Sequence, residues 1–430
     1  MPEHFARFYL SQFNKICVIL AIFSLMPKTY MKINYQIFLL QSSNFTSGLA
    51  NSIVMITIPW LILEKTDSPS FAGLVVAISA LPGLFISPIG GWLIDRIGRR
   101  TVSIGADILS SLSVLSFPVF AALFGLNNLS VLLIAFFGAI FDPAGYTARR
   151  TLLSDVANET NTDLDRLNGI HEGFLGVSWI AGPAVGAWLI ASVGAINSFW
   201  VSAVLFIFAA FSIALLKLDP EKIKSAAAKQ LIKSNTGIKV GFITLWQDKL
   251  LRTITIAILV IAAVYMPTES VVLPTYFESL GNPTGLGAVI SALAAGAAIG
   301  AFGYGWISKR FSRKAITRFT LIGSSISIIP MATLPPLPIL VAAGFLLGLA
   351  WGPFMPLMST LIQQRVQADQ HGRVFGVQTS VFYAAPPMGM VLSGLSVERF
   401  GVSATYAALA LILSTTAILS LLTKSLRSDY

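Results

Sequence analysis

Four acidic residues lie inside long apolar stretches of this chain: Asp107, Asp142, Glu172 and Glu269. A charge in an apolar medium is costly unless it faces a cavity or a partner. A carboxyl in such a place can act as a proton carrier, because it can be neutral or charged according to its surroundings. Proton binding and release is therefore the chemistry that these residues indicate.

The four acids differ in their distance from basic residues. Glu269 follows Pro267 and has no basic residue nearby in its stretch, so it is the leading candidate for the coupling carboxyl. Counted at 1.5 Å per helical residue, the other three lie roughly 10 Å from the basic ends of their stretches. Each of these three is expected either to carry a proton or to serve as a structural partner of Arg149, Arg150 or Arg166.

Other chemistry finds little support in the residues. There is no Gly-x-x-x-x-Gly-Lys-Ser/Thr loop, so ATP hydrolysis by this chain is not expected. The histidines, His4, His171 and His371, are not spaced as a metal site, and Cys17 is the single cysteine. We expect no metal, no cofactor and no enzyme activity.

The elements that position the acids must lie in lipid. Hydrophobic residues make up 55% of the 430, charged residues 11%, and the mean hydropathy is +0.77. A bilayer-spanning helix needs about 20 apolar residues. The sequence predicts an all-α membrane protein with twelve such spans, near 35–63, 71–94, 101–123, 130–153, 165–191, 195–217, 253–278, 284–307, 315–334, 338–363, 372–397 and 401–423.

The basic residues predict how these spans are oriented. All but two of the 29 Lys and Arg residues, the exceptions being Lys65 and Arg399, fall on one side of a twelve-span topology. Basic loops stay in the cytoplasm, so both termini are expected there, in the cell membrane. The net charge of +10 is thereby explained without a nucleic-acid partner.

The spans divide the chain into two halves. We expect an N-terminal extension (1–32), a six-helix half (33–217), a Lys-rich cytoplasmic linker (218–251) with a membrane-facing amphipathic stretch, and a second six-helix half (252–430). The extension contains an apolar run that is too short to span a bilayer. We expect this extension to lie on the membrane or to precede the natural start at Met31.

A basic motif recurs between the two halves. Gly91, Asp95, Arg96, Gly98, Arg99 and Arg100 form a Gly-x-x-x-Asp-Arg-x-Gly-Arg-Arg motif after the second span. Gly305, Lys309, Arg310, Arg313 and Lys314 repeat it 214 residues later. Gly138 to Pro143 and Gly348 to Pro353 form another matching pair, 210 residues apart. Collinear matches of this kind indicate two parallel repeats with pseudo-symmetry.

The first motif resembles the signature of the major facilitator superfamily of secondary transporters. That resemblance implies the major facilitator fold, with a cytoplasmic gating loop in which the Asp and Arg groups latch neighbouring helices. In the second copy Lys309 stands in place of Asp95 and Ser312 in place of Gly98. We therefore expect an acidic latch in the first half alone.

The fifth span carries Gly182, Pro183 and Gly186, a pattern similar to the fifth-helix signature of proton-driven exporters in this superfamily. The pattern predicts a helix that bends, with ordinary small-residue packing as the alternative. The eighth span has the same glycine-rich character.

Three passages are similar to the macrolide-efflux and siderophore-export branch: Asn34–Leu40, Ile58–Leu61 and Ala148–Asp155. The resemblance implies efflux of small amphipathic molecules by a monomer, powered by a proton or other cation gradient. Against it, the fourth span lacks an arginine near its middle. The alternatives are an importer or lysophospholipid carrier of the same fold, or a non-transporting membrane receptor.

The resemblance places a substrate cavity between the halves, near the bilayer midplane. Aromatic side chains there would offer flat faces to a bulky ligand. The candidates are Trp60, Phe85, Trp179, Tyr265, Trp351, Phe354 and Tyr383. The sequence does not specify the ligand.

Overall fold

The computed structural model describes residues 34–217, 238–367 and 371–422, and in these ranges the regular structure is helical. The N-terminal extension, Cys17 and most of the linker lie outside the described residues. The first half contains six long helices: α2 (Tyr35–Thr66), α3 (Pro69–Ile97), α4 (Arg99–Leu123), α5 (Asn128–Thr160), α6 (Leu164–Val193) and α7 (Ala195–Ala214). Each begins within two residues of a predicted span and ends within three, except that α5 continues to Thr160, beyond the predicted end at 153.

The second half follows a short helix, α9 (Ile238–Gln247). Its first span consists of α10 (Lys249–Pro267), a π-helical turn η2 (Thr268–Val272) and α11 (Leu273–Ser279). The others are α12 (Pro283–Arg310), α13 (Arg313–Ala332), α14 (Leu337–Trp351) with α15 (Phe354–Arg365), and α16 (His371–Leu422). Gly401, with φ 82°, divides α16 into two spans, so this half also has six.

Length and composition agree with a membrane location. Within the described residues, ten helical stretches are long and apolar enough to cross a bilayer. In this number α16 is counted once, and α3 is not included because its described apolar part, Pro69–Pro82, is shorter than the required length. The predicted fold class, an all-α membrane protein of twelve helices, is confirmed.

Short polar turns start the helices. Asn127 and Ser130 form a reciprocal capping box at the start of α5, and Asp163 accepts a hydrogen bond from the Arg166 N–H at the start of α6. These side chains satisfy N–H groups that the first helical turn leaves free.

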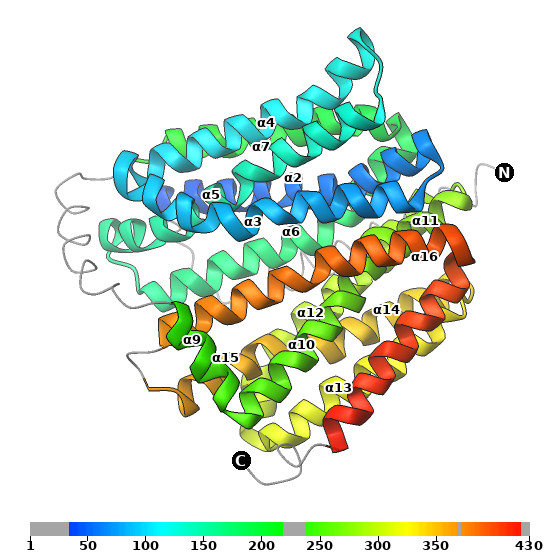
Figure 1. The fold of residues 1–430 in the computed structure, drawn as a ribbon. Helices are drawn as coiled ribbons and strands as arrows, with labels where there is room; N and C mark the ends of the chain where they lie inside the picture. The colour runs from blue at the N-terminus through cyan, green and yellow to red at the C-terminus, as the bar shows by residue number, and fades with distance from the viewer. Residues whose placement is uncertain (1–33, 218–237, 368–370, 423–430) are drawn as a thin grey trace, which may run out of the picture.

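The two halves lie side by side, with the first half above the second in Figure 1. The largest contacts between them are made by two helix pairs, α3 with α16 and α6 with α12. Both contacts lie toward the end of the bundle opposite the α3–α4 turn. A Cβ on Gly73 would come within 2.5 Å of the Met390 carbonyl, and one on Gly287 within 2.7 Å of the Pro183 carbonyl. Glycine at these positions therefore permits backbone contact between the halves.

Glycines also interlock α12 and α14. A Cβ on Gly300 would lie 2.5 Å from the Leu349 carbonyl, and Cβ atoms on Gly296, Gly348 and Gly352 would likewise collide with backbone of the facing helix. Small residues four apart let two membrane helices approach closely. This contact holds the end of α14 in a fixed position.

Candidate functional site

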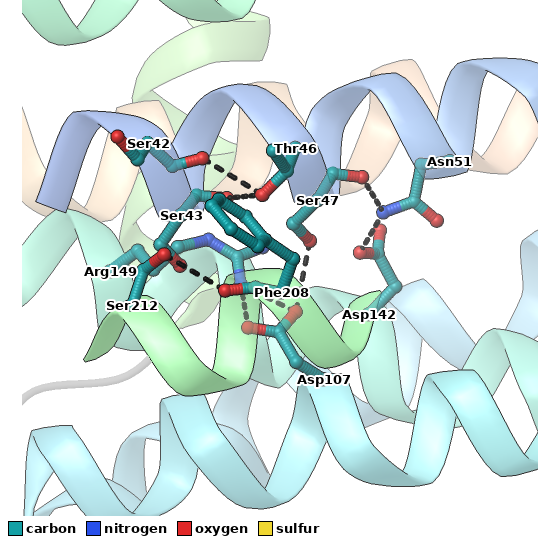
Figure 2. A network of polar contacts seen from close by, with 10 residues as sticks. All are labelled: Ser42, Ser43, Thr46, Ser47, Asn51, Asp107, Asp142, Arg149, Phe208 and Ser212. Atoms are coloured by element: carbon teal, nitrogen blue, oxygen red, sulfur yellow. Dashed lines mark hydrogen bonds and ion pairs between the residues drawn. The ribbon is translucent and has the colours of Figure 1, made fainter. Parts of the chain in front are cut away.

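A polar stripe runs along α2 and contacts three other helices of the first half (Figure 2 shows part of it). Gln41, Asn44, Ser47 and Asn51 are spaced three or four residues apart, so they share one helix face. Asn44 donates to the His171 backbone carbonyl on α6 at 2.9 Å, and Ser47 donates to Asp107 on α4 at 2.9 Å. The stripe thus connects α2 to the acids inside the bundle.

Asp107 and Arg149 form a buried ion pair between α4 and α5. The Arg149 Nη1 lies 2.8 Å from both carboxylate oxygens, and each side chain is 3% exposed. A buried pair in which each charge depends on the other is costly to break from one side. Asp107 is therefore a structural partner of Arg149, as one of the two interpretations proposed.

The sequence analysis counted Arg149 with the basic end of its span, but its side chain is buried. The expectation that the fourth span lacks an arginine near its middle stays a prediction, since Arg149 lies 11 residues from the end of α5. Arg149 points into the bundle, whereas the adjacent Arg150 is exposed and donates to Tyr146. Neighbouring helical residues point about 100° apart, so two adjacent arginines can lie in different environments.

Asp142 on α5 joins the same network through Asn51. The Asn51 amide donates to its Oδ1 at 2.5 Å and to the Ser47 carbonyl at 3.1 Å. Asp107 and Asp142 both lie in the electrostatic field of Arg149. Figure 2 shows Asp107 in contact with the Arg149 guanidinium and Asp142 in contact with the Asn51 amide.

His171 extends this region toward the start of α6. Its imidazole is fully buried, and Nδ1 lies 3.2 Å from the Gln41 Oε1. Among the residues that the structure describes, the Arg149 Nε and the His171 Nε2 have no hydrogen-bond partner. Buried polar atoms of this kind are normally satisfied by internal water.

Glu172 lies outside the network. It is 44% exposed and 3.4 Å from Arg150, which is 56% exposed. An exposed pair of this type contributes about 1 kcal/mol or less. Of the three acids near basic residues, Glu172 is thus the one at the surface.

The first motif occupies the turn between α3 and α4. Gly98 has φ 92° and ψ 147°, a conformation that is essentially restricted to glycine. Arg99 Nη1 lies 2.6 Å from Asp155 Oδ1 at the end of α5, and Arg100 donates to the Ile213 and Ala214 carbonyls at the end of α7. The motif therefore joins three helices through its arginines.

Asp155 is a site residue that the sequence analysis did not assign. It occurs in one of the passages that carry the family resemblance, but its distance from Arg99 in sequence hid the pairing. The surroundings of Gly91 and the side chain of Asp95 lie outside the described part of the structure, and Arg96 is exposed.

The second motif makes different contacts. Ser312 has ordinary extended backbone and accepts from the Ala315 N–H, so this turn does not repeat the Gly98 geometry. Arg310 stacks on Trp306, with 4.1 Å between the guanidinium carbon and the ring centroid. Gly305 and Lys309 are exposed, and Arg313 and Lys314 are partly buried.

Arg365, at the position corresponding to Asp155, pairs instead with Asp248 between α9 and α10, at 2.8 Å. Burial alone would raise the pKa of Asp248. Hydrogen bonds from the Leu251 and Leu250 N–H groups and from Arg365 outweigh it and lower that pKa. Asp248 therefore fixes the start of α10 as a charged cap.

Glu269 lies in η2, where the second half meets the first. This π turn packs against α16 and also against α2 and α3. The hydroxyl of Tyr265, one turn earlier, lies near the Glu269 carboxyl. Among the described residues, no Lys or Arg forms an ion pair with it.

Three of the predicted cavity aromatics form one stack beside Glu269. Trp351 stacks on Tyr265 at 5.6 Å between ring centroids and on Phe354 at 5.5 Å. Phe382, which the sequence analysis missed, adds a fourth ring 6.5 Å from Trp351. Trp351 ends α14 and Phe354 begins α15, on the two sides of the break at Gly352–Pro353.

Two of the remaining cavity candidates, Trp60 and Trp179, are not part of this stack. Trp60 is 6% exposed within the hydrophobic core, and Trp179 is 39% exposed on α6. The side chains of Phe85 and Tyr383 lie outside the described residues.

The glycines of the fifth span make close contacts. Gly182 faces Ser52 and Gly186 faces Ile53 and Ile56, all on α2. Pro183 lies inside α6, which is a single helix from Leu164 to Val193. Small-residue packing is therefore present, and the predicted bending stays a prediction.

The fold and these sites define a multi-pass membrane protein with two six-helix halves and charged groups sequestered in the interior. The model of the Major Facilitator Superfamily matches residues 42–281 and 270–428, and the chain belongs to this superfamily. The predicted resemblance is confirmed.

Curated relatives include efflux pumps. The multidrug efflux pump Tap of Mycolicibacterium fortuitum is 36% identical over 85% of this chain and 90% of its own length. The Tap pump of Mycobacterium tuberculosis is 34% identical over 91% and 94%. Macrolide efflux protein A of Streptococcus pyogenes is 25% identical over 83% and 88%.

Solved structures share the fold at low identity. The nucleoside transporter NupG matches with a TM-score of 0.74 and 12% identity over 91% of this chain and 100% of its own. A D-xylose–proton symporter matches with a TM-score of 0.68 and 12% identity over 92% and 99%.

Proposed function

We propose that this protein is a proton-coupled efflux pump for small amphipathic molecules, acting by alternating access in the cell membrane. The Tap and macrolide efflux relatives support the direction of transport. The protein acts as a monomer, has both termini in the cytoplasm and moves its substrate without changing it covalently. The driving force is a proton gradient, and no cofactor is required.

One observation carries the coupling: the interior of the first half holds two carboxyls, Asp107 and Asp142, for one guanidinium, Arg149. With all three charged, one net negative charge would remain in a low-dielectric interior. One proton neutralises this excess. Asp107 holds Arg149 directly, so Asp142 is the carboxyl that is available to bind and release the proton.

Glu269 is the second coupling candidate, because it too has no basic partner among the described residues. It lies at the contact between the halves, where a change of charge would act directly on their separation. Transport can use both acids, and separate substitutions distinguish their contributions.

The test is transport in proteoliposomes. We expect Asp142→Asn and Glu269→Gln to lose accumulation driven by a pH gradient while downhill exchange of substrate survives. Glu172→Gln, an acid-to-amide change at the surface, is the matched control and should retain both activities. Equal loss of uphill and downhill flux in a variant, or no loss, would reject that acid as a coupling group.

A further inference from the structure

We infer that His171 is a proton-relay residue, which passes protons between the interior acids of the first half and the end of the bundle that carries the first motif. This inference rests on the proposed function, because it names a further residue for the proton movement proposed there. His171 is fully buried, and the coupling by Asp142 and Glu269 does not use it.

The polar stripe on α2 meets one titratable side chain at each of three levels. Gln41 contacts His171 at 3.2 Å, roughly 9 Å along the helix from its start. Asp107 and Asp142 meet the stripe further in, at roughly 18 Å and 24 Å. The start of α2 lies beside the end of α7, which the first motif contacts through Arg100. His171 therefore lies between both acids and the motif end of the bundle.

The hydrogen bonding of the His171 ring suits proton transfer. The Gln41 Oε1 is an acceptor, so the contact assigns the ring proton to Nδ1. Nε2 then carries a lone pair, and no described residue donates to it. The ring can accept a proton at Nε2 and release the proton from Nδ1, which restores a neutral imidazole. Gln41 fits both tautomers, because its amide, turned by half a rotation, presents Nε2 as a donor.

Polar atoms without a partner continue from His171 toward the acids. Among the described residues, the buried side chains of Ser43, Ser103 and Arg149 each have one polar atom that makes no hydrogen bond. Ser43 lies on α2 between the levels of His171 and Asp107, and Ser103 precedes Asp107 by one turn of α4. Internal water normally satisfies such atoms, and water both accepts and donates protons. These atoms therefore mark the route between His171 and Asp107.

The groups around His171 do not trap a proton on its ring. The charged side chains whose field reaches the imidazole are Arg149 and Arg150 of α5. The α2 helix presents the Gln41 amide, α7 has no ionisable residue, and α6 meets α12 toward its other end, near Pro183. Within the described residues, no carboxylate forms an ion pair with His171. A proton that reaches the imidazole is thus free to move on.

These features predict a change of rate without a change of equilibrium. Glutamine can replace the hydrogen bond of His171, but its amide does not accept and release protons as an imidazole does. We therefore expect His171→Gln to slow the protonation of Asp142 at least tenfold. The extent of Asp142 protonation reached at each pH should stay close to that of the parent protein. A side chain that only braces α6 would not separate rate from extent in this way.

The experiment follows proton uptake by infrared spectroscopy on purified full-length protein after a rapid drop in pH. The C=O stretching band of a protonated carboxyl that disappears in Asp142→Asn identifies Asp142, and the growth of this band gives the rate. His371→Gln, the same substitution at the start of α16, is the matched control and should respond as fast as the parent protein.

A second variant keeps the inference testable if His171→Gln does not yield folded protein. Gln41→Met removes the amide that fits both tautomers and keeps a side chain of similar length, so it should slow the same band several-fold. The inference is overturned if the parent protein has no Asp142 band that responds to pH. It is also overturned if the folded variant, His171→Gln or Gln41→Met, responds as fast as the parent, or if His371→Gln is slowed equally.

The two proposals can fail separately. A slow Asp142 response in His171→Gln, without pH-driven export by the parent protein, would contradict the proposed pump and leave the relay intact. Export driven by a pH gradient, with a normal Asp142 response in His171→Gln, would overturn the relay and leave the pump intact.

Discussion

At the scale of single residues, the partner of an acid decides what the acid can do. Asp107, Asp142 and Glu172 look alike in the sequence, since each follows or precedes basic residues by about two helical turns. In the structure they are an ion-paired acid, an acid bonded to an amide, and a surface acid. We therefore expect Asp107 to contribute to stability and Asp142 to proton coupling.

The first prediction concerns stability. Asp107→Asn should destabilise the protein by about 3–5 kcal/mol, because it removes the carboxylate that bonds directly to the buried Arg149. Asp142→Asn removes the excess carboxyl while an amide remains to contact Asn51, so its melting temperature should stay close to that of the parent. Thermal unfolding in detergent measures both. Similar melting temperatures for the two variants would contradict the assignment of Arg149 to Asp107.

The second prediction concerns the gate. Asp95 is expected to pair with Arg or helix-end groups when the opposite end of the bundle opens. Asp95→Asn should therefore lower transport without reducing membrane insertion. The contacts of Arg99 and Arg100 with α5 and α7 support a latch at this turn. Normal transport by a correctly inserted Asp95→Asn protein would refute it.

The sequence alone did not predict which way each charged side chain points. The sequence identifies which acids lie in apolar stretches, but Arg149 and Arg150 are adjacent, and only their helical phase puts one inside and the other outside. The pairing of Arg99 with Asp155 spans 56 residues, so no local pattern indicates it.

At the scale of helices, glycine residues occur where two helices lie in close contact, and not only where a helix can bend. Gly296 and Gly303 are both on α12, yet a Cβ at Gly296 would collide with backbone of α14, whereas a Cβ at Gly303 would meet only Ile307 at 3.6 Å. The two positions therefore form a natural comparison within one element.

The third prediction uses this comparison. Gly296→Ala should lower the melting temperature, because α12 and α14 must separate to admit the methyl group. Gly303→Ala should leave the melting temperature unchanged or raise it, since alanine is the better helix former. Thermal unfolding of the purified variants is the measurement. Equal effects would show that the α12–α14 contact does not contribute to stability.

The sequence predicted the spans well, because about 20 apolar residues bounded by polar turns leave little ambiguity. The first predicted span, 35–63, compares with Tyr35–Thr66 in the structure. The π turn at Thr268–Val272 has no such pattern, because its residues are ordinary apolar and polar types. Phe242, Ile243 and Trp246 are exposed on α9, and the membrane-facing stretch in the linker stays a prediction.

At the scale of the whole molecule, the halves touch at the end opposite the motif. Glu398 on α16 accepts hydrogen bonds from the Ser68 hydroxyl at 3.0 Å and the Ser70 N–H at 3.1 Å at the start of α3. Below this contact, Ala77 of the first half packs with Val271 and Met390 of the second. Alternating access requires these groups to separate.

The fourth prediction tests this contact. Glu398→Ala should favour the state in which this end is open, because two hydrogen bonds between the halves are lost. In a Cys17→Ser background, a cysteine at Ala77 should react several-fold faster with a maleimide when Glu398 is replaced. Arg399→Gln is the matched control, since Arg399 stacks on Phe400 of its own helix. Unchanged reactivity would remove Glu398 from the gate.

The π turn η2 has a consequence for the length of the chain. A π turn holds about one residue more than an α turn, because its hydrogen bonds run from residue i to i+5. Deleting one residue between Thr268 and Val272 could restore an unbroken α-helix and keep Phe277 facing the core. A deletion elsewhere in this span would rotate everything beyond it by about 100°. The segment that contains Glu269 is thus the one place in this span where a residue can be removed without rotating the rest of the helix.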